Sequence, residues 1–298
     1  MSWKKLFGSR KTRATPSKQP ASGAAVLKAA VVTDLGNIRT NNEDTGLFFR
    51  IADPAIAGVN GDLLIVADGM GGHAAGEVAS RMAADTITQE YFKNGSSETI
   101  EKKLDRAFML ANSHIYDAAS ANQALRGMGT TCTALAVVNN TVYFAHVGDS
   151  RAYLIKNNSI ERITTDHTYV QQLVKEGKIT PAEAEEHPQR NILTNAMGTK
   201  PAITIDTGRC DFLLQENDVL LLCSDGLYDY LQDTEIMEMI SGCNPRQAAE
   251  ALVTEAKKRG GHDNITVVLA VKTSTASIAV LKETRDVVLP VTKEIDLP

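Results

Sequence analysis

Apolar and polar positions alternate with two different periods along the first part of the chain. The runs at 29–36 (AAVVTDLG) and 63–69 (LLIVADG) are short and almost wholly apolar until each reaches an aspartate, which is typical of buried strands. Apolar residues then recur at three- and four-residue spacing over 74–92, and again over 97–120, where Ser97 is suited to cap a helix. The pattern predicts two strands and two amphipathic helices.

The second half of the chain is richer in strand-like runs. Residues 131–164 are predicted to form three short strands joined by two Asn-Asn turns, a pattern typical of an antiparallel meander. Two later apolar runs, 218–227 and 265–272, enclose a helical pattern at 233–259. Runs of strands interrupted by helices favour an α+β fold over repeated βαβ units.

Residues 166–198 form a long, polar and partly helical connection between strand-like runs. A connection of this length inside a compact domain is typical of a functional lid or flap. We expect it to lie beside the functional site.

Charge is distributed unevenly along the 298 residues, whose net charge is −5. Residues 1–33 carry +7 and the remainder −12. We interpret 1–23 as a basic, disordered tail, 24–273 as one folded domain and 274–298 as a C-terminal tail. Because apolar residues stand among the first lysines, contact of the basic tail with an anionic membrane surface is an alternative.

The sequence indicates neither a membrane span nor a disulfide framework. No apolar run approaches the roughly 18 to 20 residues that a span needs, and the N-terminus lacks the apolar core of a signal peptide. The four cysteines lie far apart without a CxxC pair, and Cys132 and Cys223 stand in apolar runs. We expect reduced thiols and a cytoplasmic location.

Four aspartates stand where apolar strands begin or end. Asp68 ends LLIVAD, Asp225 ends VLLLCSD, Asp149 follows YFAHVG and Asp263 precedes NITVVLAV. A turn explains each one alone, but carboxylates gathered at strand ends repel one another unless cations lie between them. Ligands that are all oxygen suit Mg²⁺ or Mn²⁺ better than zinc. Together with NNED at 41–44, the pattern predicts a divalent metal site.

Seven motifs, taken in order, carry a family resemblance. They are DLGNIRTNNED, VADGMGGHAAGE, GTTCTALAV, AHVGDSRAYL, TTDHT, CSDGLYDYL and GGHDNITVVLAV. Over about 29–272 the chain resembles the metal-dependent Ser/Thr protein phosphatases of the protein phosphatase 2C type, in their bacterial form. The resemblance implies that 24–273 is a catalytic domain with an α+β fold. In that fold two antiparallel β-sheets pack as a sandwich flanked by pairs of α-helices, with the flap 166–198 near the active site.

The resemblance also implies the ligands of two core metal ions. Asp68 matches the carboxylate that bridges both ions, and the carbonyl of Gly69 reaches one of them. Asp225 and Asp263 match the residues that hold the other ion. Glycine after aspartate lets the backbone come close enough for such a carbonyl contact.

Three further acidic residues match metal-site positions of the family. Glu43 and Asp44 match residues that contact the core ions largely through bound water. Asp149 matches a residue that in bacterial relatives helps to hold a third, weaker ion, with Asp225 shared.

Two residues match, or stand near, positions that act on the substrate. Arg39 matches the arginine that grips the substrate phosphate, a task suited to a planar guanidinium; the alternative is a surface salt bridge. Animal relatives carry a histidine directly after the Asp-Gly pair, but this chain has Met70 there. His73 is therefore the nearest candidate for a proton donor, and a histidine that only orders the loop is the alternative.

The implied reaction is hydrolysis of phosphoserine and phosphothreonine on proteins. A hydroxide that bridges two Mn²⁺ or Mg²⁺ ions attacks directly, so no side-chain nucleophile is needed. The chain has no Cys-x5-Arg signature, which counts against a thiol phosphatase.

The expected partners are phosphorylated proteins and a cognate bacterial Ser/Thr kinase. We expect a monomer that binds no nucleic acid. Two alternatives stay open: a regulatory phosphatase of one partner-switching protein, and a catalytically inactive relative that acts as a phosphoprotein-binding module.

Overall fold

The computed structural model describes residues 26–71, 74–93 and 98–273. The tails predicted at 1–23 and 274–298, and the candidate proton donor His73, lie outside the described residues. Within the described ranges, no helix is both long and apolar enough to cross a membrane.

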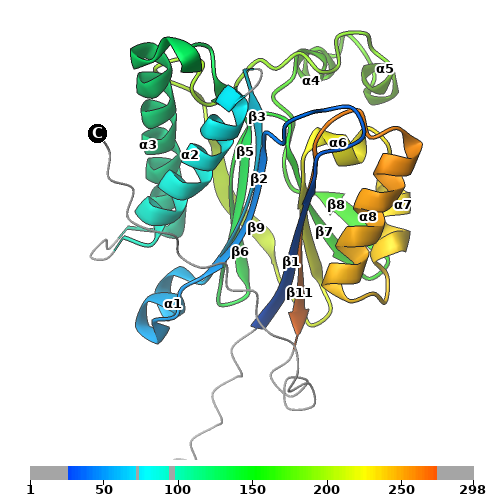
Figure 1. The fold of residues 1–298 in the computed structure, drawn as a ribbon. Helices are drawn as coiled ribbons and strands as arrows, with labels where there is room; N and C mark the ends of the chain where they lie inside the picture. Colours follow the sequence, from blue (N-terminus) through cyan, green and yellow to red (C-terminus); the bar gives the residue numbers. More distant parts are fainter. Residues whose placement is uncertain (1–25, 72–73, 94–97, 274–298) are drawn as a thin grey trace, which may run out of the picture.

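Two antiparallel sheets pack face to face in the middle of the molecule (Figure 1). One has the strand order β1-β11-β10-β7-β8, and the other β2-β3-β5-β6-β9 with β4 paired to β3. The strands of the five-stranded sheet are β1 (Val26–Asp34), β7 (Arg151–Lys156), β8 (Ser159–Arg162), β10 (Val219–Cys223) and β11 (Ile265–Thr273). The strands of the six-stranded sheet are β2 (Asp44–Arg50), β3 (Asp62–Met70), β4 (Gly129–Thr130), β5 (Cys132–Val138), β6 (Thr141–Val147) and β9 (Asp206–Leu213).

A pair of helices covers the outer face of each sheet (Figure 1). Helices α2 (Ala74–Tyr91) and α3 (Ile100–Ala121) pack on the six-stranded sheet, and α7 (Asp233–Ile240) and α8 (Pro245–Arg259) on the five-stranded one. The predicted α-β-β-α sandwich is confirmed. The short helices are α1 (Pro54–Asn60), α4 (Tyr169–Lys175), α5 (Pro181–Glu185), α6 (Asp225–Tyr228) and a 3₁₀ turn at Gln123–Leu125.

Strand β3 shows how the sequence fills the layers. Its residues are apolar on both faces, as expected for a strand covered on both sides. Leu63 and Ile65 pack toward α2 and α3, whereas Leu64 and Val66 pack between the two sheets. Packing on both faces therefore fixes the position of the strand up to Asp68.

The prediction of three strands in one meander at 131–164 is wrong. Four strands form there, and they divide between the two sheets: β5 pairs with β6, and β7 with β8. Both Asn-Asn turns form as predicted, with positive φ at all four asparagines. Between β6 and β7 the chain crosses from one sheet to the other at Gly148, whose φ of 106° favours glycine. This crossing places Asp149 between the sheets.

Other element boundaries also differ from the prediction. Helix α3 begins after Thr99, whose side chain accepts from the Lys102 amide, so Ser97 is not its N-cap. The helical pattern at 233–259 is broken into α7 and α8 around Gly242, whose φ is 73°. The sequence reasoning missed α1 and the strands β2, β4 and β9.

The predicted flap, 166–198, carries α4 and α5 and lies beyond the sheets, at the top of Figure 1. A cavity of about 500 Å³ separates these helices from the connection between α6 and α7, and Asp149 lies in its wall. Whether this segment acts as a flap stays a prediction.

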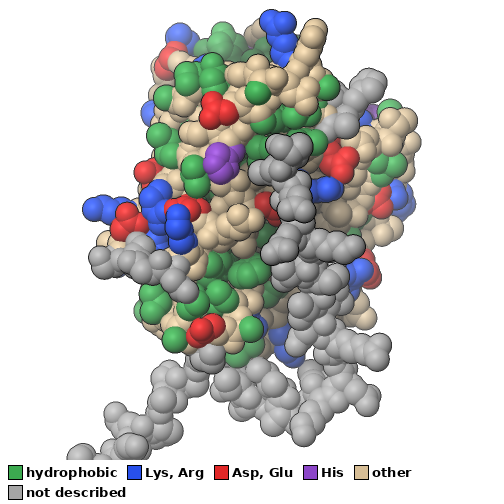
Figure 2. All heavy atoms as spheres, turned by 60° about the vertical axis from the view of Figure 1, so that its left-hand side comes forward, with side chains coloured by type: hydrophobic (Ala, Val, Ile, Leu, Met, Phe, Trp, Pro, Cys, Tyr) green, Lys and Arg blue, Asp and Glu red, His purple; other side chains and the backbone are tan. Residues whose placement is uncertain are grey.

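The side of the molecule formed by α2 and α3 faces forward in Figure 2. Acidic, basic and apolar side chains are interspersed on this face. Such a mixture is typical of an ordinary solvent-facing helix surface.

Gly46 of β2 lies in close contact with side chains of the other sheet, which leads to a stability prediction. A Cβ there would lie 2.8 Å from the Thr266 methyl and 2.9 Å from a Val31 methyl. We expect Gly46→Ala to lower the free energy of unfolding by about 1–3 kcal/mol, because a packed core cannot absorb the added atom. Urea denaturation measures the change.

Gly58→Ala is the matched control for this prediction. Gly58 lies in α1, where nothing stands within 4 Å of the added atom. Alanine should stabilise that helix by up to about 1 kcal/mol. Equal effects of the two substitutions would contradict the packing argument.

Candidate active site

Two carboxylates of the six-stranded sheet meet at the end of the space between the sheets. Strands β2 and β3 pair so that Asp44 stands directly opposite Asp68. Directly opposed residues of an antiparallel pair point to the same face. Asp68 shares its face of β3 with Leu64 and Val66, which pack between the sheets. Both carboxylates therefore close one end of the inter-sheet core.

The five-stranded sheet brings three more aspartates to the same end. Cys223, the last residue of β10, pairs with Arg151, the first residue of β7, and with the beginning of β11. Asp225 follows Cys223 by two residues and opens α6. Asp149 precedes β7 by two residues, and Asp263 precedes β11 by two. Strand pairing alone thus gathers residues that lie more than a hundred positions apart.

Ser224, which the sequence reasoning missed, joins the two sheets at this point. Its hydroxyl donates to Asp44 Oδ2 at 2.7 Å and accepts from the Thr266 amide at 3.0 Å. Ser224 is fully buried. A small polar residue directly before Asp225, at the end of an apolar run, was the available signal.

Asn264 is the second buried polar residue that the sequence reasoning missed. Its Oδ1 accepts from the Glu43 amide at 2.8 Å, and its Nδ2 donates to the carbonyls of Leu35 and Asn41, both at 3.0 Å. The side chain thereby fixes both ends of the loop that carries Arg39. Its position between Asp263 and the apolar run of β11 was the signal.

Gly69 follows Asp68 where no side chain fits. Its amide donates to the Glu43 carbonyl at 3.1 Å, and a Cβ would lie 2.5 Å from that same oxygen and against the Gly76 carbonyl. A Cβ on Gly76 would in turn overlap Glu43 Oε2, so the Glu43 carboxylate packs against the first turn of α2. These glycines let the backbone close around the acidic residues.

Burial and mutual repulsion raise the carboxylate pKa values. The pKa values of Asp68 and Asp225 are raised well above the ordinary value, first because both are buried and then because neighbouring aspartates repel their charges. Burial also raises the pKa of Asp44 to about 6, with a contribution from Asp263. Burial raises that of Asp149 to about 7. Without a bound metal ion, the four aspartates therefore do not all ionise near neutral pH.

The donor set fits hard divalent cations. Asp44 Oδ1 and Asp225 Oδ1 are buried and accept no hydrogen bond from the described residues. Unpartnered buried carboxylate oxygens are costly unless a cation binds them. In the described ranges, no three His, Cys, Asp or Glu side chains are arranged so that they could hold an ion as they stand. Ion binding would therefore draw the carboxylates together.

Arg39 lies at the rim of the acidic cluster. Its Nη2 donates to Asp263 Oδ2 at 2.6 Å, and about half of its side chain is exposed. The hydrogen bond to Asp263 raises the arginine pKa, and the charges of Glu43 and Asp68 add to the effect. Arg39 is thus paired and still open to an anion from solvent.

The structure brings the described candidate residues to one end of the sandwich. These are Arg39, Glu43, Asp44, Asp68, Gly69, Asp149, Asp225 and Asp263. His73 lies outside the described residues. The metal and phosphate roles of the gathered residues stay predictions.

Comparison with known proteins identifies the family. The sequence profile of the protein phosphatase 2C family matches residues 55–256, more than half of the chain. The chain is a member of the protein phosphatase 2C family. The family predicted from the seven motifs is confirmed.

Bacterial proteins are among the relatives of this protein phosphatase 2C member. The serine/threonine phosphatase stp of Listeria welshimeri is 39% identical over 247 residues, which are 82% of this chain and 95% of the relative. The solved structure of the serine/threonine phosphatase Stp1 from Staphylococcus aureus matches with 37% identity and a TM-score of 0.72, covering 85% of this chain and 98% of that one. The catalytic domain of PstP, solved in complex with two manganese ions, matches with 36% identity and a TM-score of 0.70, covering 84% and 100%.

The raised pKa values predict how the stability of this metal-free protein phosphatase 2C chain depends on pH. In the unfolded chain an aspartate ionises near about 3.9. Folded Asp44 and Asp149, with pKa values of about 6 and about 7, keep their protons to higher pH. Their stabilising contribution is therefore complete below the unfolded value and is lost as pH rises through the folded values. Chelator-treated protein should unfold at a lower temperature at about pH 8 than at about pH 5.5.

Asp149→Asn tests the origin of this slope. The variant lacks one titrating carboxyl, so its unfolding temperature should fall less between the same two pH values. A wild-type unfolding temperature that rises with pH, or an unchanged slope in Asp149→Asn, would contradict the assignment.

Proposed function

We propose that this chain is a metal-dependent protein serine/threonine phosphatase that hydrolyses phosphoserine and phosphothreonine on proteins. The observation that carries the proposal is the meeting of strand-end aspartates in a buried cluster with unpartnered oxygens, in a member of the protein phosphatase 2C family. The relatives' names, serine/threonine phosphatase stp and PstP, support the same activity. They support it over the alternative of an inactive binding module.

The proposed metal ligands are Asp68, Asp225, Asp263 and the Gly69 carbonyl for two core ions. Glu43 and Asp44 would contact these ions largely through water, and Asp149 would help to hold a third, weaker ion. Mn²⁺ and Mg²⁺ are the proposed ions, because the donors are all oxygen and the related PstP domain contains two manganese ions. Such ions, when bound, supply Lewis acidity to phosphoryl oxygens and activate water near neutral pH.

The chain's own residues bind and orient the phosphate. Arg39, held at the rim by Asp263 and half exposed, offers its remaining N–H donors to the phosphate oxygens. The thiols of Cys132 and Cys223 are buried, and burial raises their pKa, so neither serves as a thiolate nucleophile. His73 stays the proposed proton donor to the leaving alkoxide.

The proposal includes partners and location. Phosphorylated proteins are the substrates, and a bacterial Ser/Thr kinase supplies them. The chain acts as a cytoplasmic monomer, and its four free cysteines suit a reducing compartment. Residues 24–273 form the catalytic domain, 166–198 its flap, and 1–23 and 274–298 its tails.

Phosphate release from a phosphothreonine peptide tests the proposed activity. Wild-type protein whose metal ions have been removed with a chelator should release no phosphate, and added Mn²⁺ or Mg²⁺ should restore its activity. Asp225→Asn should stay at least about a hundredfold below wild type, because it removes a charged ligand from the core site. Asp211→Asn, an exposed carboxylate change on β9, is the charge-matched control and should behave as wild type. A folded wild-type protein that stays silent with every divalent ion would overturn the proposal.

Arg39→Lys tests phosphate binding separately from turnover. Lysine keeps the charge but loses the planar pair of donors, so KM should rise about tenfold while kcat changes less than about threefold. Steady-state kinetics over a range of peptide concentrations gives both constants. A fall in kcat at unchanged KM would instead place Arg39 in the chemical step.

A further inference from the structure

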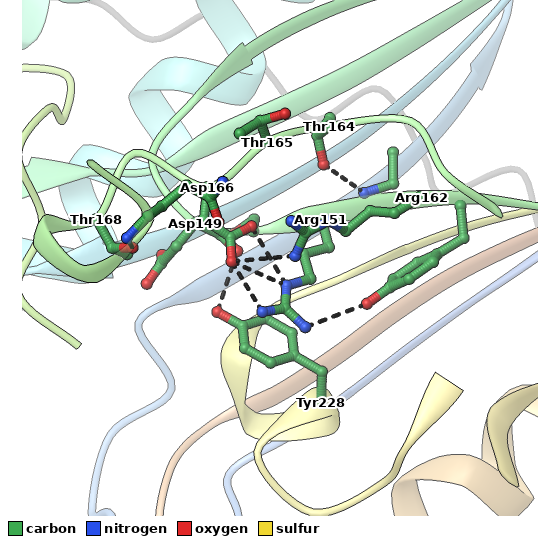
Figure 3. A network of polar contacts seen from close by, with 12 residues as sticks. Asp149, Arg151, Arg162, Thr164, Thr165, Asp166, Thr168 and Tyr228 are labelled. Carbon is green, nitrogen blue, oxygen red and sulfur yellow. Dashed lines mark hydrogen bonds and ion pairs between the residues drawn. The ribbon is translucent and has the colours of Figure 1, made fainter. Parts of the chain in front are cut away.

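The guanidinium of Arg151 lies where three segments of the candidate site meet (Figure 3). Its Nη2 donates to Asp166 Oδ2 at 2.8 Å and its Nε to both Asp166 oxygens, at 3.1 and 3.3 Å. Its Cζ stands 3.6 Å from the centre of the Tyr228 ring. Arg151, on strand β7, thus contacts both Asp166, the first residue of the predicted flap, and Tyr228, in helix α6.

The partners of Arg151 in turn hold the loop that carries Asp149. The Tyr228 hydroxyl donates to the Asp149 carbonyl at 3.1 Å. Burial raises the pKa of Tyr228 well above its usual value, so the hydroxyl keeps its proton. His167, next to Asp166, donates its amide to the Gly148 carbonyl at 2.7 Å, and its Nδ1 accepts from the Gly148 amide at 3.2 Å. The loop is therefore gripped from two sides.

The same helix places Asp225. Tyr228 and Asp225 stand in the single turn of α6, which runs from Asp225 to Tyr228. Movement of the Tyr228 ring would therefore shift Asp225 together with the Asp149 loop. If the Arg151 guanidinium were lost, Arg162, at 3.3 Å, would be the remaining ion-pair partner of the buried Asp166 among the described residues.

We propose that Arg151 is a positioning residue which, through Tyr228 and Asp166, anchors the backbone that carries Asp149 and Asp225, so that both carboxylates face one divalent cation site. This inference rests on the proposed function and concerns the weaker ion site at Asp149. Arg151 touches neither substrate nor ion; it acts through the tyrosine hydroxyl and the flap root. Lysine cannot replace it, because only a planar guanidinium stacks on a ring and bonds a carboxylate through two nitrogens at once.

Mn²⁺ titration of metal-free protein, followed by the EPR signal of the free ion, tests the proposal without relying on activity. Tyr228→Phe keeps the ring under Arg151 and removes only the hydroxyl. It should weaken the weaker class of Mn²⁺ site about fivefold, the effect of one lost hydrogen bond. Arg151→Lys should weaken it by about tenfold or more, because stacking and bidentate bonding are both lost. The tighter sites should change less.

Arg162→Lys is the matched control. Arg162 bonds the same carboxylate through one contact at 3.3 Å and does not reach Tyr228 among the described contacts. The Mn²⁺ affinities of this variant should stay within about twofold of wild type, since lysine keeps the charge and can make the same single contact to Asp166. The unfolding temperature of metal-free Tyr228→Phe should stay close to wild type, which separates positioning from a general loss of structure.

The other possible outcomes would overturn either the positioning role of Arg151 or the proposed function. If folded Tyr228→Phe and Arg151→Lys both bind Mn²⁺ as wild type does, Arg151 does not position Asp149. Equal weakening by all three variants would assign the effect to general loosening and overturn the proposal as well. If wild type itself binds no Mn²⁺, the proposed function fails first, so the two failures are distinguishable. Should Arg151→Lys not fold, Tyr228→Phe alone decides.

Discussion

Repulsion among carboxylates buried at one end of the sandwich is the constraint on which the rest of the structure depends. Asp44 and Asp68 stand opposite each other on paired strands, and Asp225 approaches them from the other sheet. Ionised carboxylates in such surroundings are costly without a countercharge. The apolar layers inside and outside both sheets hold the strand ends together against this repulsion. A divalent cation is the partner that would relieve it.

Strand register places the candidate ligands: Asp44 and Asp68 lie within paired strands, and Asp149, Asp225 and Asp263 lie within two residues of a strand end. A strand covered on both faces cannot slip by one residue without turning every side chain to the wrong layer, so its last residue is placed as firmly as its core. Two buried polar residues complete the arrangement. Ser224 forms a hydrogen bond with Asp44 of the other sheet, and Asn264 forms one with the amide of Glu43. Precision of this kind is what a site for two closely spaced ions requires.

The sequence predicted what local pattern controls and missed what long-range pairing controls. The aspartate at the end of an apolar run is visible in the sequence, and so is the order of the seven motifs. The division of 131–164 between two sheets is not, because the crossing at Gly148 depends on which partner strand is available. Strand β9 was not predicted because it lies at the edge of its sheet, where exposed positions carry the charged residues Arg209 and Asp211 and the apolar run is interrupted. The Arg151 contacts escaped for a similar reason: Tyr228 is 77 positions away and meets it only in the fold.

Anomalous diffraction from crystals grown with Mn²⁺ tests the central claim most directly. The account predicts two strong anomalous peaks between Asp68, Asp225 and Asp263, with the carboxylates of Asp68 and Asp225 drawn in toward them. Peaks only at the protein surface, with this end of the sandwich free of manganese, would contradict it.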